Sequence, residues 1–147
     1  MKAETLEGWH FAEWGAPIVP EQSIGFVLRD KGKLKAIAAV CWVDKPLDPS
    51  LPAGWWAFFD SLGPVSPLAH RYAIKVRDAL GAGGADCAYA EADPGILRSE
   101  EWLQRLGFKR WRGSVWRLEF VVDGKGNRAS RFWKRGQGSR KASANCR

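Results

Sequence analysis

Acidic side chains stand at the ends of two apolar runs, where they could do chemistry. Asp60 lies near the end of the run at 55–62. Glu91 and Asp93 end the run at 86–93. If both runs are strands, these side chains lie at carboxyl ends, which is where α/β-type sheets place ligands. A carboxylate there can act as a general base that accepts a proton from a bound group. The alternative is a solvated charge at the end of a strand.

The sequence offers few other side chains for catalysis or metal binding. Its only imidazoles are His10 and His70, and Cys41, Cys87 and Cys146 lie far apart without a CxxC pair. Zinc sites need several Cys or His ligands at characteristic spacings. The sequence therefore predicts no metal site, and it leaves little room for a Ser-His-Asp triad.

Basic residues are concentrated at the C-terminus. The 147-residue chain has a net charge of +7, and residues 124–147 hold eight Lys or Arg and no Asp or Glu. The rest of the chain carries 15 basic and 16 acidic groups, so its charge is nearly balanced. This division predicts a domain at 1–122 and a basic C-terminal extension at 123–147. The extension has too few apolar residues to fold by itself.

The first half of the chain predicts a hairpin and a central strand. Residues 23–30 and 34–43 are rich in apolar and β-branched residues, and Lys31-Gly32-Lys33 between them suits a tight turn. A loop with three prolines follows at 44–54. The run at 55–62 is apolar on both faces, which is typical of a strand inside a sheet.

Two helices are predicted in the second half. The helix at 66–81 has Ser66 as N-cap, Pro67 at its first position and Gly81 where a left-handed residue would end it. The helix at about 96–106 ends at Gly107, after which Phe108 can fold back onto Leu103. A strand follows at 114–122 and a turn at 123–127. Residues 128–135 suit either a hairpin partner or the start of a loose tail.

This order of elements resembles the GCN5-related N-acetyltransferase (GNAT) superfamily over residues 23–122. The stretch AEADPGILRSEEWLQRLGFKR, residues 90–110, looks like the strand–turn–helix–Gly-Phe signature of that family. The resemblance implies an α/β fold: a mixed, mostly antiparallel sheet with helices on its faces and reduced N-terminal helices. It also implies that acetyl-CoA binds between two parallel strands that splay apart, here 55–62 and 86–92, with Asp60 or Glu91 as catalytic base.

The resemblance places the cofactor's pyrophosphate at the mouth of the helix at 66–81. The residues that would bind it are Leu62, Gly63, Val65, Ser66, Leu68, Ala69, His70 and Arg71. The family's loop is rich in glycine, whereas residues 63–69 contain one glycine and two prolines, Pro64 and Pro67, which lack an N–H group. Leu103 stands where many members carry the tyrosine that protonates the leaving thiolate.

Two classes of function follow. The first is an acetyl-CoA-dependent N-acetyltransferase acting on a small amine or a protein amine. The second is a non-catalytic scaffold of the same fold, such as a phage virion or assembly protein, that binds protein or nucleic acid through residues 110–147. In that region Trp111, Trp116 and Trp133 lie among basic residues. Such tryptophans can stack on bases or on a partner, and they suit a charged sheet edge equally well.

The sequence also makes a prediction about location. No run approaches the roughly 18 consecutive apolar residues of a membrane span. The N-terminus MKAETLEGWHFAEW carries acidic residues where a signal peptide needs an apolar segment. We therefore expect no membrane association and a cytoplasmic protein, or a virion component if the chain is phage-encoded.

Overall fold

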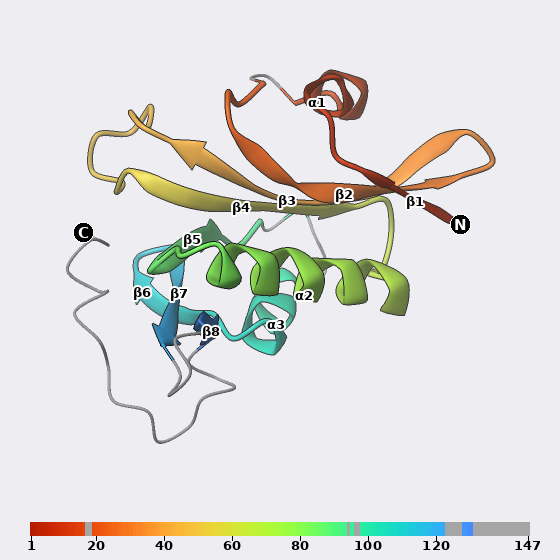
Figure 1. Ribbon diagram of the computed structural model, residues 1–147. Helices are drawn as coiled ribbons and strands as arrows, with labels where there is room; N and C mark the ends of the chain where they lie inside the picture. The colour runs from red at the N-terminus through yellow and green to blue at the C-terminus, as the bar shows by residue number, and fades with distance from the viewer. Residues whose placement is uncertain (17–18, 94, 96–97, 123–127, 131–147) are drawn as a thin grey trace.

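A single twisted sheet carries helices on both faces (Figure 1). The computed structural model describes residues 1–16, 19–93, 95, 98–122 and 128–130, the last three and 121–122 by their backbone. The described strands are β1 (Lys2–Thr5), β2 (Ser23–Asp30), β3 (Lys33–Val43), β4 (Gly54–Ser61), β5 (Cys87–Glu91), β6 (Lys109–Arg112), β7 (Val115–Val122) and β8 (Arg128–Ser130). The described helices are α1 (Gly8–Trp14), α2 (Pro67–Ala82) and α3 (Ser99–Arg105).

The strands lie in the order β1-β2-β3-β4-β5-β7-β6, and β8 pairs with β7. Every described pair is antiparallel except β4 with β5. The predicted fold class, a mixed and mostly antiparallel sheet with helices on its faces, is confirmed. One seven-residue helix, α1, precedes β2 in the described chain, in line with the expected reduction of the N-terminal helices.

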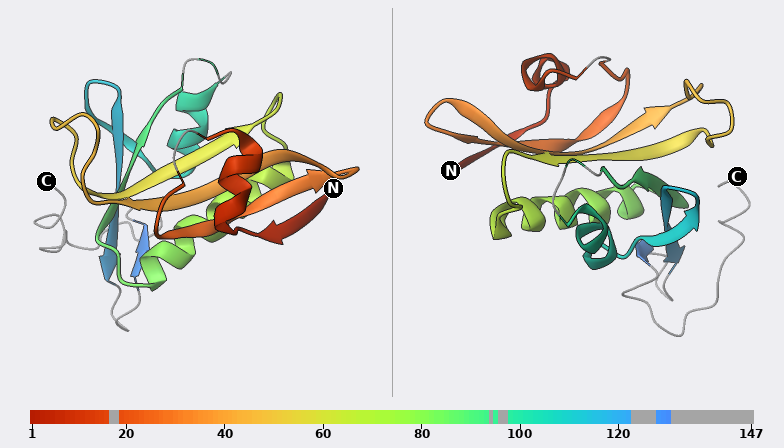
Figure 2. Two further views of the ribbon diagram at one scale, coloured as in Figure 1. Left: turned by 90° about the horizontal axis from the view of Figure 1, so that it is seen from above. Right: turned by 180° about the vertical axis from the view of Figure 1, so that it is seen from behind.

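The two faces of the sheet are covered by different helices. Figure 2 shows α1 on one face and α2 and α3 on the other. Alternation along β4 sends successive side chains to opposite faces. Phe58 packs against Phe11 of α1, and Phe59 packs against Trp102 of α3. The larger apolar core lies between the sheet and the α2–α3 layer.

The predicted hairpin and central strand are both confirmed. β2 and β3 pair in antiparallel register, and Lys31 and Gly32 between them have φ angles of 51° and 81°. Positive φ at both central residues is what a type I′ turn requires. β4 lies inside the sheet, between β3 and β5.

Helix α2 begins as predicted, but its end is not where the sequence suggested. Ser66 Oγ accepts a hydrogen bond from the Ala69 N–H at 3.0 Å, and Pro67 occupies the first turn. The expectation that Gly81 ends the helix is wrong, because α2 continues to Ala82 and Gly81 is buried inside it. A Cβ at Gly81 would lie 2.7 Å from Phe120 Cδ1. Because Gly81 has no side chain, Phe120 of β7 can pack directly against α2 at this position.

The end of α3 is confirmed. Gly107 has a φ angle of 99°, and the Phe108 N–H donates to the Leu103 carbonyl at 3.0 Å. Phe108 and Leu103 are buried in the same core. This arrangement is a Schellman cap with its apolar contact. The helix is described over Ser99–Arg105, and residues 96–97 of the predicted span lie outside the described residues.

Three elements were not predicted from the sequence. β1, α1 and β6 are short, and β6 has the sequence KRWR, whose charged residues hide its pairing with β7. Residues 128–130 form β8 on β7, which agrees with the hairpin alternative for this part of the chain. The predicted turn at 123–127 and residues 131–147 lie outside the described residues.

None of the helices in the described residues is long and apolar enough to cross a membrane. The longest, α2, has 16 residues and is about 24 Å long, against a hydrocarbon core of about 30 Å. The part of the chain that the structure describes also brings together no three His, Cys, Asp or Glu side chains that could hold a metal ion.

Candidate functional site

The parallel strands β4 and β5 meet at one register pair, Trp56 with Tyr89. Beyond this pair the ladder is not continued, although β4 runs on to Ser61 and β5 to Glu91. Helix α2 connects the two strands and starts just after β4 ends. The structure therefore contains the expected separation of these strands beside the first turn of α2.

Aromatic side chains fill most of the space between the separated strands. The rings of Phe59 and Trp102 lie 5.6 Å apart between their centroids, at an interplanar angle of 41°. A cavity of about 30 Å³ remains, which is about the volume of one water molecule. Its lining consists of Ala57, Phe59, Ala90, Glu91, Asp93, Ser99, Trp102 and Leu103. We call this space the slot, and it is closed in this structure.

A larger cavity of about 510 Å³ lies at the mouth of α2. Its lining comes from the start of α2 (Pro64, Val65, Ser66, Pro67 and His70) and from α3 and the residue before it (Arg98, Glu101, Trp102 and Arg105). We call this cavity the mouth. Trp102 lines both the mouth and the slot. The indole ring of Trp102 therefore stands between them.

The charge at the mouth comes from α3 rather than from α2. Arg98 and Arg105 bring two positive charges, and Glu101 lies 3.9 Å from Arg98. His70 Nδ1 accepts a hydrogen bond of 3.1 Å from the Trp102 indole N–H. Burial, followed by the charges of Arg105 and Arg77, lowers the pKa of His70. A neutral His70 is what this hydrogen bond requires, because an imidazolium has no acceptor nitrogen.

The helix terminus itself offers few donors. Pro67 has no N–H. The Ala69 N–H is taken by Ser66 Oγ, and the His70 N–H donates to the Ser66 carbonyl at 3.0 Å. In the described structure Leu68 therefore has the one N–H of this first turn that is left for a ligand. An anion at the mouth would depend on side-chain charge more than on the helix terminus.

The structure brings three of the eight predicted cofactor contacts to the mouth: Val65, Ser66 and His70. Leu68 and Ala69 pack on the sheet instead. Leu62 and Gly63 precede the mouth in an exposed turn, and Arg71 is exposed on α2. The sequence analysis missed Arg98, Trp102 and Arg105. All three lie in or next to the signature helix, but only the packing of α3 against α2 shows that they face the mouth.

The two candidate carboxylates lie in different cavities. Asp60 is next to α1, where its Oδ2 accepts from the Trp14 indole N–H and its Oδ1 from the Ser61 N–H, both at 2.8 Å. Glu91 lines the slot and accepts from Ser114 Oγ at 3.3 Å. The structure does not bring them together as a pair. Glu91 is the one that faces the slot.

The aromatic and basic residues after α3 divide between core and surface. Trp116 is 2% exposed and belongs to the core, with Arg110 over its ring and paired with Glu100. Arg112 lies over Trp111 at 4.0 Å from the ring centroid. Trp116 is therefore a core residue of an inner strand, Trp111 lies on the edge strand β6, and Trp133 lies outside the described residues.

Comparison with solved structures adds a likeness at low identity. A solved acetyltransferase is similar to this chain. It is the crystal structure of the acetyltransferase from Agrobacterium tumefaciens str. C58, with 18% identity and a TM-score of 0.46, and the match covers 75% of this chain. The match covers 63% of that protein, less than two thirds of its length. No family model matches this chain, and no curated protein matches it.

Proposed function

We propose that the protein is an acyl-CoA-dependent N-acyltransferase, with acetyl-CoA as the donor and a small amine or a protein amine as the acceptor. The observation that carries the proposal is the single register pair between β4 and β5, Trp56 with Tyr89, at a point where α2 begins beside the separated strands. A parallel pair that opens next to a helix N-terminus offers both a slot and an anion site.

The residues at the mouth fit the phosphates of such a donor. Arg98 and Arg105 supply charge, and the cavity of about 510 Å³ supplies room. The slot fits less well, because Phe59 and Trp102 leave only about 30 Å³. Binding of the pantetheine arm would require these two rings to move. When bound, the donor supplies an activated acyl group at the slot.

The chain's own residues would then act on the acceptor. A carboxylate oxygen of Glu91 would take the proton of the attacking amine. This role is supported by its place in the slot lining and its exposure at the end of β5. Asp60 is the alternative candidate for the catalytic base. Its oxygens accept hydrogen bonds from the Trp14 indole N–H and the Ser61 N–H. Leu103 can donate no proton, so water serves as the proton source for the leaving group.

The closed slot favours a second candidate function. In a non-catalytic scaffold, Phe59 and Trp102 would be permanent core residues, and the protein would bind protein or nucleic acid through residues 110–147. A virion or assembly role and the division into 1–122 and 123–147 belong to this candidate. Arg112 stacked on Trp111 is the described feature that fits a binding surface of this kind.

Calorimetry with acetyl-CoA on the full-length protein separates the two candidates. We expect Arg105→Gln to weaken binding about 5–10-fold through loss of a phosphate contact. Arg71→Gln is the matched control, because Arg71 is exposed on α2 and lines no described cavity, and we expect no change. Phe59→Ala opens the slot and should strengthen binding.

The enzyme and the scaffold predict opposite results in this experiment. Saturable binding that Arg105→Gln weakens and Arg71→Gln leaves unchanged supports the enzyme. Absence of binding at millimolar acetyl-CoA, in both the wild type and Phe59→Ala, overturns it and leaves the scaffold. Retention of a folded Phe59→Ala protein is checked by circular dichroism.

A further inference from the structure

A polar cluster lies on the sheet face opposite α2 and α3. Tyr89 on β5 and Arg117 on β7 are register partners, so their side chains lie on the same face. Trp111 on β6 lies beside both. Its ring centroid is 5.2 Å from that of Tyr89 and 5.7 Å from Arg117 Cζ. We call these three residues the Tyr89 cluster.

The cluster holds buried donors without acceptors. Tyr89 is 0% exposed, and its hydroxyl has no hydrogen-bond partner among the described residues. Arg117 Nε is also buried and has no hydrogen-bond partner among the described residues, whereas the buried Nη2 lies 3.2 Å from Glu119 Oε1 in an ion pair. Buried polar atoms in folded proteins nearly always have partners, because an unmet donor costs its lost hydration. The Tyr89 hydroxyl and Arg117 Nε are thus two unmet donors at one place, and they point to an acceptor that is brought from outside.

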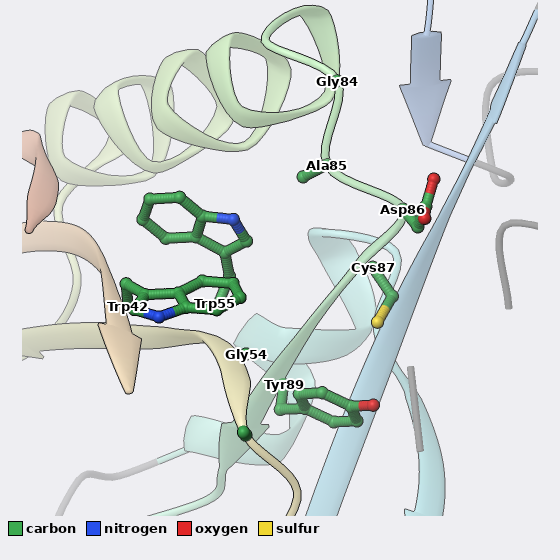
Figure 3. Close-up of a pocket in the computed structure, with 9 residues that line it drawn as sticks. Trp42, Gly54, Trp55, Gly84, Ala85, Asp86, Cys87 and Tyr89 are labelled. Carbon is green, nitrogen blue, oxygen red and sulfur yellow. The ribbon is translucent and has the colours of Figure 1, made fainter. Parts of the chain in front are cut away.

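The neighbouring cavity does not supply that acceptor. Figure 3 shows a cavity of about 230 Å³ in which Trp42, Trp55 and Tyr89 form part of the wall. The Tyr89 hydroxyl points away from Trp42 and Trp55 in this view. The hydroxyl is therefore directed away from the two tryptophans of this cavity.

Charge and shape define the kind of acceptor. Glu119 pairs with one nitrogen of the guanidinium, Nη2, and leaves Nε without a partner among the described residues. Arg112 adds a second positive charge, since both Arg117 and Arg112 oppose the rise that burial causes in the pKa of Tyr89. A guanidinium N–H donates charge-assisted hydrogen bonds to a carboxylate. The surrounding side chains, Leu51, Trp56, Trp111 and Val115, are apolar.

We propose that the Tyr89 cluster is a binding site for a small carboxylate with an apolar body. The carboxylate accepts hydrogen bonds from Arg117 Nε and from the Tyr89 hydroxyl, while Nη2 keeps its contact with Glu119. Its apolar body lies against Trp111 and Leu51. The ligand enters from the side of Arg117, whose side chain is 14% exposed, whereas Tyr89 is closed off. The site lies across the sheet from the mouth and the slot, so it is independent of the proposed acyl donor.

The test uses 3-phenylpropionate as the probe, with its neutral amide as the matched ligand. Both are titrated into the full-length protein by calorimetry and thermal melting, without any acyl donor. We expect the carboxylate to bind at least about tenfold more tightly than the amide, which is the size of a charge-assisted hydrogen bond. Inorganic phosphate serves as a third probe. It should raise the melting temperature of the protein less than 3-phenylpropionate does.

Three variants locate the binding. Arg117→Gln should weaken 3-phenylpropionate binding about tenfold or more, and Tyr89→Phe several-fold. Arg110→Gln is the control, since Arg110 is exposed, pairs with Glu100 and points to the other face, and it should bind like the wild type. Without ligand, Tyr89→Phe should melt at the same temperature as the wild type or higher, because it removes a donor that has no partner.

Specific results would overturn the proposal. These are the absence of saturable binding, equal binding of carboxylate and amide, equal protection by phosphate, or a lower melting temperature of ligand-free Tyr89→Phe. If circular dichroism shows that Arg117→Gln does not fold, Tyr89→Phe and the neutral amide decide the question without it.

Discussion

Trp102 donates its indole N–H to Nδ1 of His70 across 3.1 Å, and this hydrogen bond joins α3 to the first turn of α2. The indole is 6% exposed and packs against Phe59 on its other side. Its position decides whether the mouth and the slot are connected. The protonation of His70 therefore bears on the candidate site as well as on stability.

Stability should fall as the pH is lowered past the ordinary pKa of histidine. Burial, Arg105 and Arg77 lower the pKa of His70 below 6.5 in the folded protein. Between that lowered value and 6.5 the unfolded chain binds more protons than the folded one, so the free energy of unfolding decreases as the pH falls. Above about 6.5 the contribution is fully present.

Urea denaturation between pH 8 and pH 5 measures this effect. His70→Asn is the control, because the amide oxygen can accept from Trp102 but does not titrate. The variant should lose less stability than the wild type over the same pH range. Parallel pH curves for the two proteins would show that His70 is not responsible.

Replacement of Arg77 should destabilise the fold strongly. Its guanidinium is buried, with Nη1 donating to the Leu106 carbonyl at 3.0 Å and Nε to Asp78 Oδ1 at 2.9 Å. The bond to Leu106 ties the end of α3 to α2. We expect Arg77→Met to lower the free energy of unfolding by about 2–4 kcal/mol. Arg71→Met, exposed on the same helix, should change it by less than about 0.5 kcal/mol.

Gly81→Ala should destabilise a helix that propensity alone says it should stabilise. Alanine is favoured over glycine inside a helix by about 1 kcal/mol. The new Cβ would lie 2.7 Å from Phe120 Cδ1, and overpacking of a core costs about 1–3 kcal/mol. Thermal melting should show a net loss. The double variant Gly81→Ala/Phe120→Leu should recover part of it, and a Gly81→Ala protein more stable than the wild type would contradict the packing described here.

The contact between Trp14 and Asp60 should couple α1 to β4. The indole N–H donates to Asp60 Oδ2 at 2.8 Å. In a double-mutant cycle of Trp14→Phe and Asp60→Ala, we expect a coupling energy of about 0.5–1.5 kcal/mol from chemical denaturation. Strict additivity of the two changes would mean that this hydrogen bond contributes nothing, and it would leave Asp60 available for another role.

The features that sequence analysis predicted well are those that depend on neighbouring residues. The Ser66 cap, the positive φ at Lys31 and Gly32 and the Gly107–Phe108 cap each involve residues at most five apart. Their geometry follows from side-chain reach and from the freedom of glycine, so the sequence pattern is sufficient. The order of strands and helices followed from these local elements.

The candidate site depends on contacts between distant residues. His70 and Trp102 are 32 positions apart, and Asp60 and Trp14 are 46 apart. β6 exists because β7 offers it a partner, and Gly81 stays helical because Phe120 lies against it. No local preference specifies any of these pairings.

By itself, the sequence determined the order of the main strands, the main helices and their caps, and a chain whose basic charge is concentrated at one end. The tertiary structure alone decided which face each carboxylate occupies, that two aromatic rings close the slot, and that the positive charge at the mouth comes from α3. The physical reason is that propensities and caps act within a few residues, whereas burial and charge at a site depend on which surfaces meet when the whole chain packs.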